Sequence, residues 1–300
     1  NYPEKKAQLF LINPLKDTTI YGEEGTEVHI PAHSLTSSNL VELQLKEYYA
    51  LSDMMINDMS TISDGTLIET GGSIYLDARD QTNKKKVTIN PNIGLDIAFT
   101  DGKDDSTMQV FIKDPTSKKM NWILPSRNVT KVMKKWSMTE TLLDAEGNVV
   151  STKTYNSKKE WEDHLKVEAA KKKAADEIVA KKQENYEKLK VYDLGYINCD
   201  RFPNEPMIPY AVRPDDSLVA EYFIVFDDVR GVLKGTAAGG KVSFGQVPEN
   251  KKATLIAVAF LGDKAYFYKK PIATSEKQNT AVNLRRVDKS VVDQQLAMLK

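Results

Sequence analysis

The stretch LGYINCDRF (194–202) contains the only cysteine of the 300-residue chain, Cys199. One amide and two charged groups adjoin it, those of Asn198, Asp200 and Arg201. A cysteine becomes a nucleophile when a histidine, a helix N-terminus or nearby cations stabilise its thiolate. The segment is therefore the first candidate for an active site, and the chemistry would be hydrolysis through Cys199 or through a carboxylate such as Asp200.

The conformation expected for this segment favours a structural role. In a strand, alternate side chains point to opposite faces, so Cys199 and Arg201 share one face with Ile197. Asn198 and Asp200 lie on the opposite face. A free cysteine beside isoleucine is typical of a buried thiol, so burial of Cys199 is the favoured interpretation and the nucleophile remains the alternative.

The histidines suggest a second kind of chemistry, metal binding. His29 and His33 have the i,i+4 spacing of helical zinc sites. Pro31 lies between them and TEVHIP alternates like a strand, so a shared helical face is not expected. A zinc site also needs further ligands that the sequence does not indicate. His164, in a polar segment, is expected to be a solvated surface group.

An acidic loop offers oxygen ligands instead. Asp101, Asp104 and Asp105 lie in DGKDDS, and such carboxylates suit Ca²⁺. The loop does not match the spacing of an EF-hand, and Asp-Gly is an ordinary turn sequence. A turn is therefore favoured, and no metal or other cofactor is predicted.

The glycine pair in IETGGS (68–73) has a structural interpretation. Gly71 and Gly72 allow positive φ or a close backbone approach between strands, and Glu69 could fix the turn by accepting hydrogen bonds. A phosphate-binding loop would need a following helix and a lysine. A strand pattern follows here, so nucleotide binding is not expected.

Charge and hydropathy exclude several classes of partner. The 42 basic and 42 acidic residues cancel, so the chain has no overall attraction to nucleic acid or anionic lipid. The lysine runs are short and lack interleaved aromatic residues. No apolar run reaches 18 residues, so no transmembrane helix is predicted. The chain begins with Asn1 rather than Met, which leaves open a lipid anchor upstream.

Short strands separated by turn sequences dominate residues 1–156. Val41, Leu43 and Leu45 alternate with polar residues, which predicts a strand with one face in a core. Many such strands without alternating helices are typical of an antiparallel β-sandwich. Residues 130–156 resemble a hairpin and are assigned to the same domain as an extension.

A second β domain is expected after a helical arm. Residues 157–190 contain no glycine or proline and are rich in Ala, Lys and Glu, which predicts a long, charged α-helix. Residues 191–286 return to about seven short strands, typical of an immunoglobulin-like or transthyretin-like sandwich. Residues 287–300 predict a short helix. The predicted fold class is mainly β, with two antiparallel sandwiches joined by the helix.

Four stretches together resemble exported proteins of Bacteroidetes with an N-terminal β-sandwich similar to the ZU5 module. The stretches are KDTTIYGEEGTEVHIPAHSL (16–35), LKEYYALSDMM (45–55), STISDGTLIETGGSIYLDA (60–78) and LGYINCDRF (194–202). The resemblance implies a protein of the periplasm, outer membrane or cell surface, without a known reaction and without catalytic residues. The residues that carry this signature, expected to be structural, are Glu69, Gly71, Gly72, Asn198, Cys199, Asp200 and Arg201.

The resemblance also bears on self-cleavage. Some ZU5 modules cleave themselves at a His-Phe-Ser tripeptide, whereas this chain has His33, Ser34 and Leu35, so cleavage is not expected. The predicted function is a non-enzymatic, extracytoplasmic binding or scaffolding protein that contacts protein or glycan through its β domains. The alternative is a hydrolase that uses Cys199 or Asp200.

Overall fold

The computed structural model is mainly β and antiparallel, which confirms the predicted class. It describes residues 4–100, 107–125, 137–143, 149–155, 164, 180–185, 189–215, 217–226, 228–275 and 280–299. Within these ranges the helices are short, α1 (Leu51–Ile56) and α3 (Lys289–Ala297). The second of them corresponds to the helix predicted near the end of the sequence.

The described C-terminal part of the segment 157–190 does not form the long charged helix that was predicted for it. Most of that segment, 157–163, 165–179 and 186–188, lies outside the described residues. Its described C-terminal part is β-structure, strand β13 (Ala180–Asn185) and strand β14 (Leu189–Val191). Strand pairing therefore overrides the helix propensity of Ala, Lys and Glu in this part, because propensity is only a weak preference.

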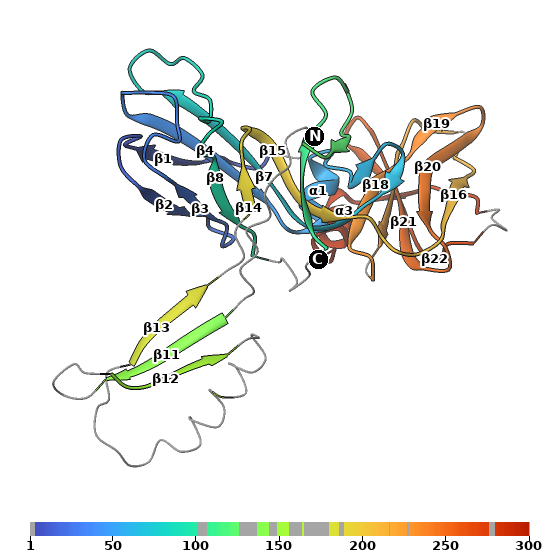
Figure 1. Ribbon diagram of the computed structural model, residues 1–300. Helices are drawn as coiled ribbons and strands as arrows, with labels where there is room; N and C mark the ends of the chain where they lie inside the picture. Colours follow the sequence, from blue (N-terminus) through green and yellow to red (C-terminus); the bar gives the residue numbers. More distant parts are fainter. Residues whose placement is uncertain are drawn as a thin grey trace.

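Strand β13 belongs to a small antiparallel sheet with the order β12-β11-β13. Its other strands are β11 (Ser137–Leu143) and β12 (Val149–Tyr155). They correspond to the hairpin expected within 130–156, and their connection lies outside the described residues. In Figure 1 this sheet lies apart from the rest of the β-structure.

The first sandwich consists of a six-stranded sheet, β1-β4-β7-β15-β9-β10, facing a four-stranded sheet, β14-β8-β3-β2 (Figure 1). Alternating apolar residues from both sheets, among them Val28, Leu43, Leu76, Ile97 and Cys199, form its core. The remaining strands are β1 (Gln8–Ile12), β2 (Thr18–Tyr21), β3 (Glu27–Ile30), β4 (Val41–Tyr48), β7 (Glu69–Asp80), β8 (Leu95–Ala98), β9 (Gln109–Lys113), β10 (Trp122–Ile123) and β15 (Gly195–Arg201).

The second sandwich packs the sheet β16-β20-β6-β5, with β19 beside β20, against the sheet β18-β17-β21-β22-β23. Its core includes Tyr210, Ile224, Phe244 and Leu255. Its strands are β5 (Ile62–Ser63), β6 (Thr66–Leu67), β16 (Met207–Val212), β17 (Glu221–Phe226), β18 (Gly231–Lys234), β19 (Thr236–Ala238), β20 (Lys241–Pro248), β21 (Lys252–Leu261), β22 (Lys264–Ala273) and β23 (Arg285–Val287).

A third apolar core joins the two sandwiches. Phe111 and Trp122 from the six-stranded sheet pack with Phe223 and Ile256 from the second sandwich, and α1 and α3 add apolar side chains such as that of Met54. Burying each large side chain of this kind contributes roughly 1.5–3 kcal/mol. The sandwiches are therefore held together by a continuous core rather than tethered by a linker.

The sandwiches also exchange segments. Strands β5 and β6, from residues 62–67, join a sheet of the second sandwich, whereas β14 and β15, from residues 189–201, complete the two sheets of the first. The expectation that LGYINCDRF opens the C-terminal β domain therefore differs from the structure. Strand β15 is buried on both faces between β7 and β9, as is usual for a central strand.

Candidate functional site

The structure brings the signature residues of the sequence together on two neighbouring strands. In the pairing of β7 with β15, Glu69 lies opposite Arg201, and Thr70 lies opposite Asp200. The register shifts between Asn198 and Asp200, which leaves the glycine pair of β7 in a β-bulge. The two segments are therefore neighbours in one sheet, and the sequence did not indicate this pairing.

Gly72 of this bulge has a backbone that favours glycine. Its φ is +131°, and a Cβ atom at this position would overlap the ring of Tyr49. The Tyr49 hydroxyl lies 2.8 Å from Oγ1 of Thr26 and accepts a hydrogen bond from the backbone N–H of Thr100. The missing side chain of Gly72 thus leaves room for the buried ring of Tyr49, which follows β4 and extends to the β2–β3 turn.

Cys199 lies on the core face of β15. Its side chain is 4% exposed and packs in the core of the first sandwich together with Ile197, as the alternation predicts. The histidines have other partners or positions. His29 bonds Thr19 through Nδ1 at 3.2 Å, and the ring of His164 stacks on Tyr155. A reactive cysteine is normally accessible and electropositive in its surroundings, and this thiol is enclosed by apolar side chains.

Asp200 lies on the opposite face of β15 and is fully buried. Oγ1 of Thr70 donates to Oδ1 of Asn198 at 3.0 Å, and Nδ2 of Asn198 donates to Oδ2 of Asp200. Within the described chain, Oδ1 of Asp200 has no hydrogen-bond partner. Burial raises the pKa of Asp200 well above its usual range, and the donors from Thr70 and Asn198 oppose this rise only in part. Burial therefore shifts this carboxyl toward its protonated form.

An ion pair closes the end of the same strand pair. Nη2 and Nε of Arg201 lie 2.6 Å and 2.8 Å from Oε2 of Glu69. Glu69 is buried and Arg201 is partly exposed. Removing Arg201 would leave a buried carboxylate without that partner, which is costly in free energy.

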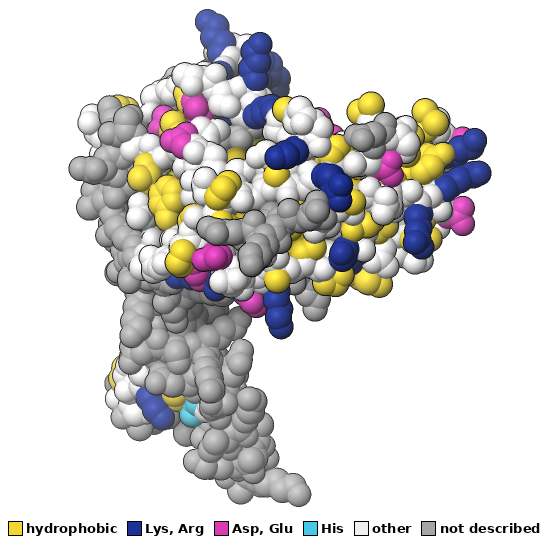
Figure 2. All heavy atoms as spheres, turned by 90° about the vertical axis from the view of Figure 1, so that its right-hand side faces the viewer, with side chains coloured by type: hydrophobic (Ala, Val, Ile, Leu, Met, Phe, Trp, Pro, Cys, Tyr) yellow, Lys and Arg dark blue, Asp and Glu magenta, His cyan; other side chains and the backbone are white. Residues whose placement is uncertain are grey.

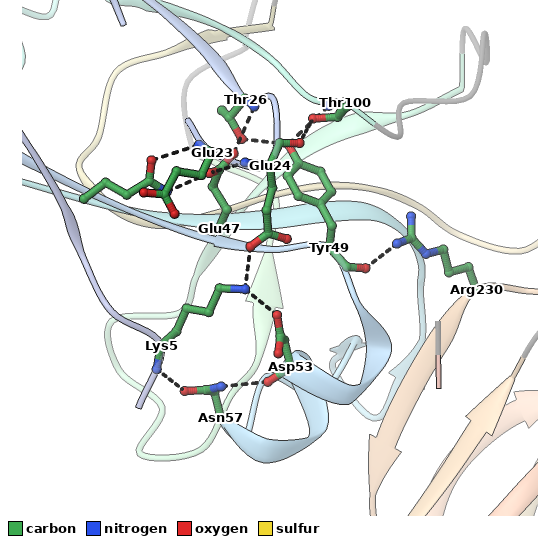
Figure 3. A network of polar contacts seen from close by, with 11 residues as sticks. Lys5, Glu23, Glu24, Thr26, Glu47, Tyr49, Asp53, Asn57, Thr100 and Arg230 are labelled. Carbon is green, nitrogen blue, oxygen red and sulfur yellow. Dashed lines mark hydrogen bonds and ion pairs between the residues drawn. The ribbon is translucent and has the colours of Figure 1, made fainter. Parts of the chain in front are cut away.

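A further buried carboxylate, that of Glu47 in β4, was not identified from the sequence (Figure 3). Its Oε1 accepts a hydrogen bond from the backbone N–H of Thr26 at 2.9 Å. Its Oε2 accepts one from the backbone N–H of Glu24 at 2.9 Å and one from Nε2 of Gln8 at 2.7 Å. Burial alone would raise the pKa of Glu47, but these donors outweigh it and lower the pKa. The ionised carboxylate fastens the β2–β3 turn to β4.

The network extends to the second sandwich, as Figure 3 shows. Nζ of Lys5 pairs with both Glu24 and Asp53, which joins the N-terminal segment to the turn and to α1. Burial alone would lower the pKa of Lys5, but the two carboxylates outweigh it and raise the pKa. Beside this pair, Nη2 of Arg230 donates to the backbone oxygen of Tyr49. The polar groups therefore connect the N-terminal segment, the β2–β3 turn, β4 and α1 with Arg230 of the second sandwich.

One signal in the sequence could have identified Glu47. It continues the core-face period of Val41, Leu43 and Leu45, so alternation alone places a carboxylate among buried positions. A carboxylate at a position that faces the core is stable there only when hydrogen-bond donors surround it. No comparable signal marks Lys5, because its partners come from distant segments.

The described metal candidates, His29 and His33, do not belong to a group of potential ligands. The calcium candidates Asp101, Asp104 and Asp105 lie outside the described residues. His33 has a positive φ of 63° in the turn that follows β3. Across the described ranges, no three His, Cys, Asp or Glu side chains are grouped as metal ligands would be.

The surface carries mixed charges. Figure 2 shows Lys, Arg, Asp and Glu interspersed with hydrophobic side chains over the end formed by the second sandwich. Among the described residues, no helix combines the length and the apolar character needed to cross a membrane. Searches for similar proteins found no matching protein-family model, no matching curated protein and no matching solved structure.

Proposed function

We propose that this chain is a non-enzymatic, extracytoplasmic binding or scaffolding protein of the bacterial cell envelope, which contacts protein or glycan through its β-sandwiches. The observation that carries this proposal is the burial of both residues on which the alternative, a hydrolase, depends. Cys199 faces the core of the first sandwich and Asp200 is enclosed at the junction. A nucleophile or general acid must reach its substrate, and neither side chain is presented to solvent.

The edge of the first sandwich supports a protein partner. Strand β1 is the terminal strand of the six-stranded sheet, and its sequence, QLFLI, contains no charged residue. Its outward side chains Leu9 and Leu11 are 62% and 57% exposed. Natural proteins usually protect such edges with charges or proline. An uncharged edge with exposed leucines suits the addition of an extended segment from a partner protein.

The envelope location comes from the resemblance of the four sequence stretches to exported proteins of Bacteroidetes. The continuous apolar core between the two sandwiches is consistent with a scaffold that presents surfaces rather than one that closes on a substrate. The two functions differ in the accessibility of the thiol, and that difference can be measured.

Capture from a detergent extract of Bacteroidetes envelopes tests the binding function. The immobilised full chain is compared with a Leu9→Lys/Leu11→Lys variant and with a Val219→Lys control at a side chain that is 99% exposed elsewhere. We expect the wild type and the control to retain the same protein and the edge variant to lose it. Equal capture by all three would exclude the β1 edge as the contact.

Alkylation tests the alternative. Iodoacetamide labelling of Cys199, followed by mass spectrometry, is measured in native buffer and in urea. We expect labelling only after unfolding, because the thiol is buried. Rapid labelling of the native protein at neutral pH would favour the hydrolase.

A further inference from the structure

A cavity of about 390 Å³ lies on the first sandwich, away from the junction. It is formed where the β7–β8 connection passes the link between β14 and β15, and it opens to solvent on one side. Its lining combines apolar, aromatic and charged side chains: Lys86, Val87, Thr88, Ile89, Pro91, Tyr192, Asp193 and Leu194. Neither the signature residues nor the β1 edge takes part in it.

The walls of this cavity are fixed by the fold. Ile89 forms a β-bridge with Leu35, and Thr36 accepts and donates hydrogen bonds with Thr88, whose hydroxyl lies 2.9 Å from that of Thr36. Lys190, just before the second wall, bonds the backbone oxygen of Ile93 at 3.1 Å. Preformed walls avoid the entropic cost of ordering a site when a ligand binds.

The position of Tyr192 depends on a glycine. Gly94 has φ +75°, and a Cβ atom there would lie only 2.9 Å from Cε1 of Tyr192. The missing side chain allows the aromatic ring to lie against the backbone at the end of the β7–β8 connection. The ring is thus held at the cavity while it remains partly exposed.

The lining chemistry defines the class of ligand. Val87 and Ile89 are buried and give an apolar floor, Tyr192 offers an aromatic ring, and Lys86 and Asp193 are exposed and supply a donor and an acceptor. A sugar ring matches this combination, because its C–H face packs on an aromatic ring while its hydroxyl groups bond charged side chains. The single lysine and the single aspartate cancel in charge.

Other ligand classes fit less well. A phosphorylated ligand would need several cations or a helix N-terminus, whereas the lining has one cation beside one carboxylate. A lipid chain would need a lining without exposed charges. We propose that this cavity binds a saccharide unit without net charge. The proposal rests on the proposed binding function and names glycan as one of its ligands.

Titration calorimetry with the full chain tests the site. The probes are chitotetraose, cellotetraose and maltotetraose, with tetragalacturonate as the charged comparison. We expect at least one neutral tetrasaccharide to bind, Tyr192→Ala to weaken it at least tenfold, and Tyr192→Phe to keep the affinity within threefold because the ring remains. Tyr21→Ala, at an exposed tyrosine of β2, is the matched control and should leave binding unchanged.

Asp193→Asn provides a second variant at an exposed position, so a folding defect of Tyr192→Ala would not decide the question. We expect it to weaken binding at least threefold. The inference is overturned if none of the neutral probes binds, if both variants bind as well as the wild type, or if tetragalacturonate binds better than the neutral probes. Retention of the envelope protein by the Tyr192→Ala variant in the capture experiment would then leave the proposed function standing without this site.

Discussion

Replacing Glu47 by glutamine removes one charge from the buried network without changing the shape of the side chain. The amide has one oxygen and one NH₂ group, whereas the carboxylate accepts from three donors. If the oxygen faces Glu24 and Gln8, the NH₂ group faces the backbone N–H of Thr26. Rotating Gln8 would not restore the network, because its Oε1 accepts from the backbone N–H of Glu23 at 2.9 Å. Every orientation therefore places a donor against a donor.

The expected loss of stability follows from these contacts. One hydrogen bond from a buried N–H to a charged acceptor is lost, at about 1.5–3 kcal/mol, and the remaining two lose their charge assistance. We expect the Glu47→Gln variant to lose about 3 kcal/mol of unfolding free energy. For a chain of 300 residues the entropy of unfolding is about 0.63 kcal/mol/K, so such a loss lowers the melting temperature by about 5 °C.

The assay is urea denaturation followed by circular dichroism, with Glu42→Gln as the control. Glu42 lies on the same strand but on the outward face, 3.9 Å from Lys84, and its loss should cost less than about 0.5 kcal/mol. Equal stabilities of the two variants would refute the role assigned to Glu47.

The pKa of Glu47 is lowered by folding from an ordinary value of 4.5, so its stabilisation is present above that pH and lost as the pH falls below it. The Glu47→Gln variant should lack this part of the acid sensitivity.

Four further changes test the junction and the thiol. Gly22→Ala should destabilise the fold by more than about 1 kcal/mol, because its Cβ would overlap the carboxylate of Glu47; thermal melting measures this, and an unchanged melting temperature would contradict it. Arg201→Met should cost about 3 kcal/mol in urea, and much of this loss should be recovered when Glu69→Gln is added; additive losses would argue against the ion pair. Because folding raises the pKa of Asp200, its contribution to stability falls as the pH rises above about 4, where the unfolded chain releases the proton. The unfolding free energy of Asp200→Asn should therefore rise relative to that of the wild type between pH 4 and pH 8. A difference in unfolding free energy that does not change with pH would contradict the raised pKa of Asp200. Cys199→Ser should leave any hydrolysis of p-nitrophenyl acetate at the wild-type level. Loss of that activity in the variant would support Cys199 as a nucleophile.

Local patterns predicted the strands well because alternation reports which face of a strand is buried. Val41, Leu43 and Leu45 of β4 are buried as expected. Glu47 continues the same alternation and is buried, but its burial depends on hydrogen-bond donors from β1 and from the β2–β3 turn. Alternation within one strand cannot reveal such partners. Partners from separate segments become visible only when the sheets are assembled.

Local alternation does not predict the sheet to which a strand belongs. The alternation of LGYINCDRF identified the buried face of Cys199, yet nothing local indicated that β15 would pair with β7 and β9. The composition of 157–190 favoured a helix, whereas strand β13 pairs with β11 along all six of its residues. Long-range pairing overrides local preference where a neighbouring strand satisfies the backbone.

The position of β15 between β7 and β9 has a consequence for biosynthesis. Thr70 and Asn198, which meet across this pairing, are 128 residues apart. A ribosome that adds 5–20 residues per second needs roughly 6–25 s to make that interval. During this time the edge of β7 lacks its native neighbour, and exposed edges of this kind pair readily with other chains. The nascent protein is thus open to aggregation over an interval long enough for a holding chaperone to act, and the first sandwich closes only after the strand that bears Cys199 has emerged.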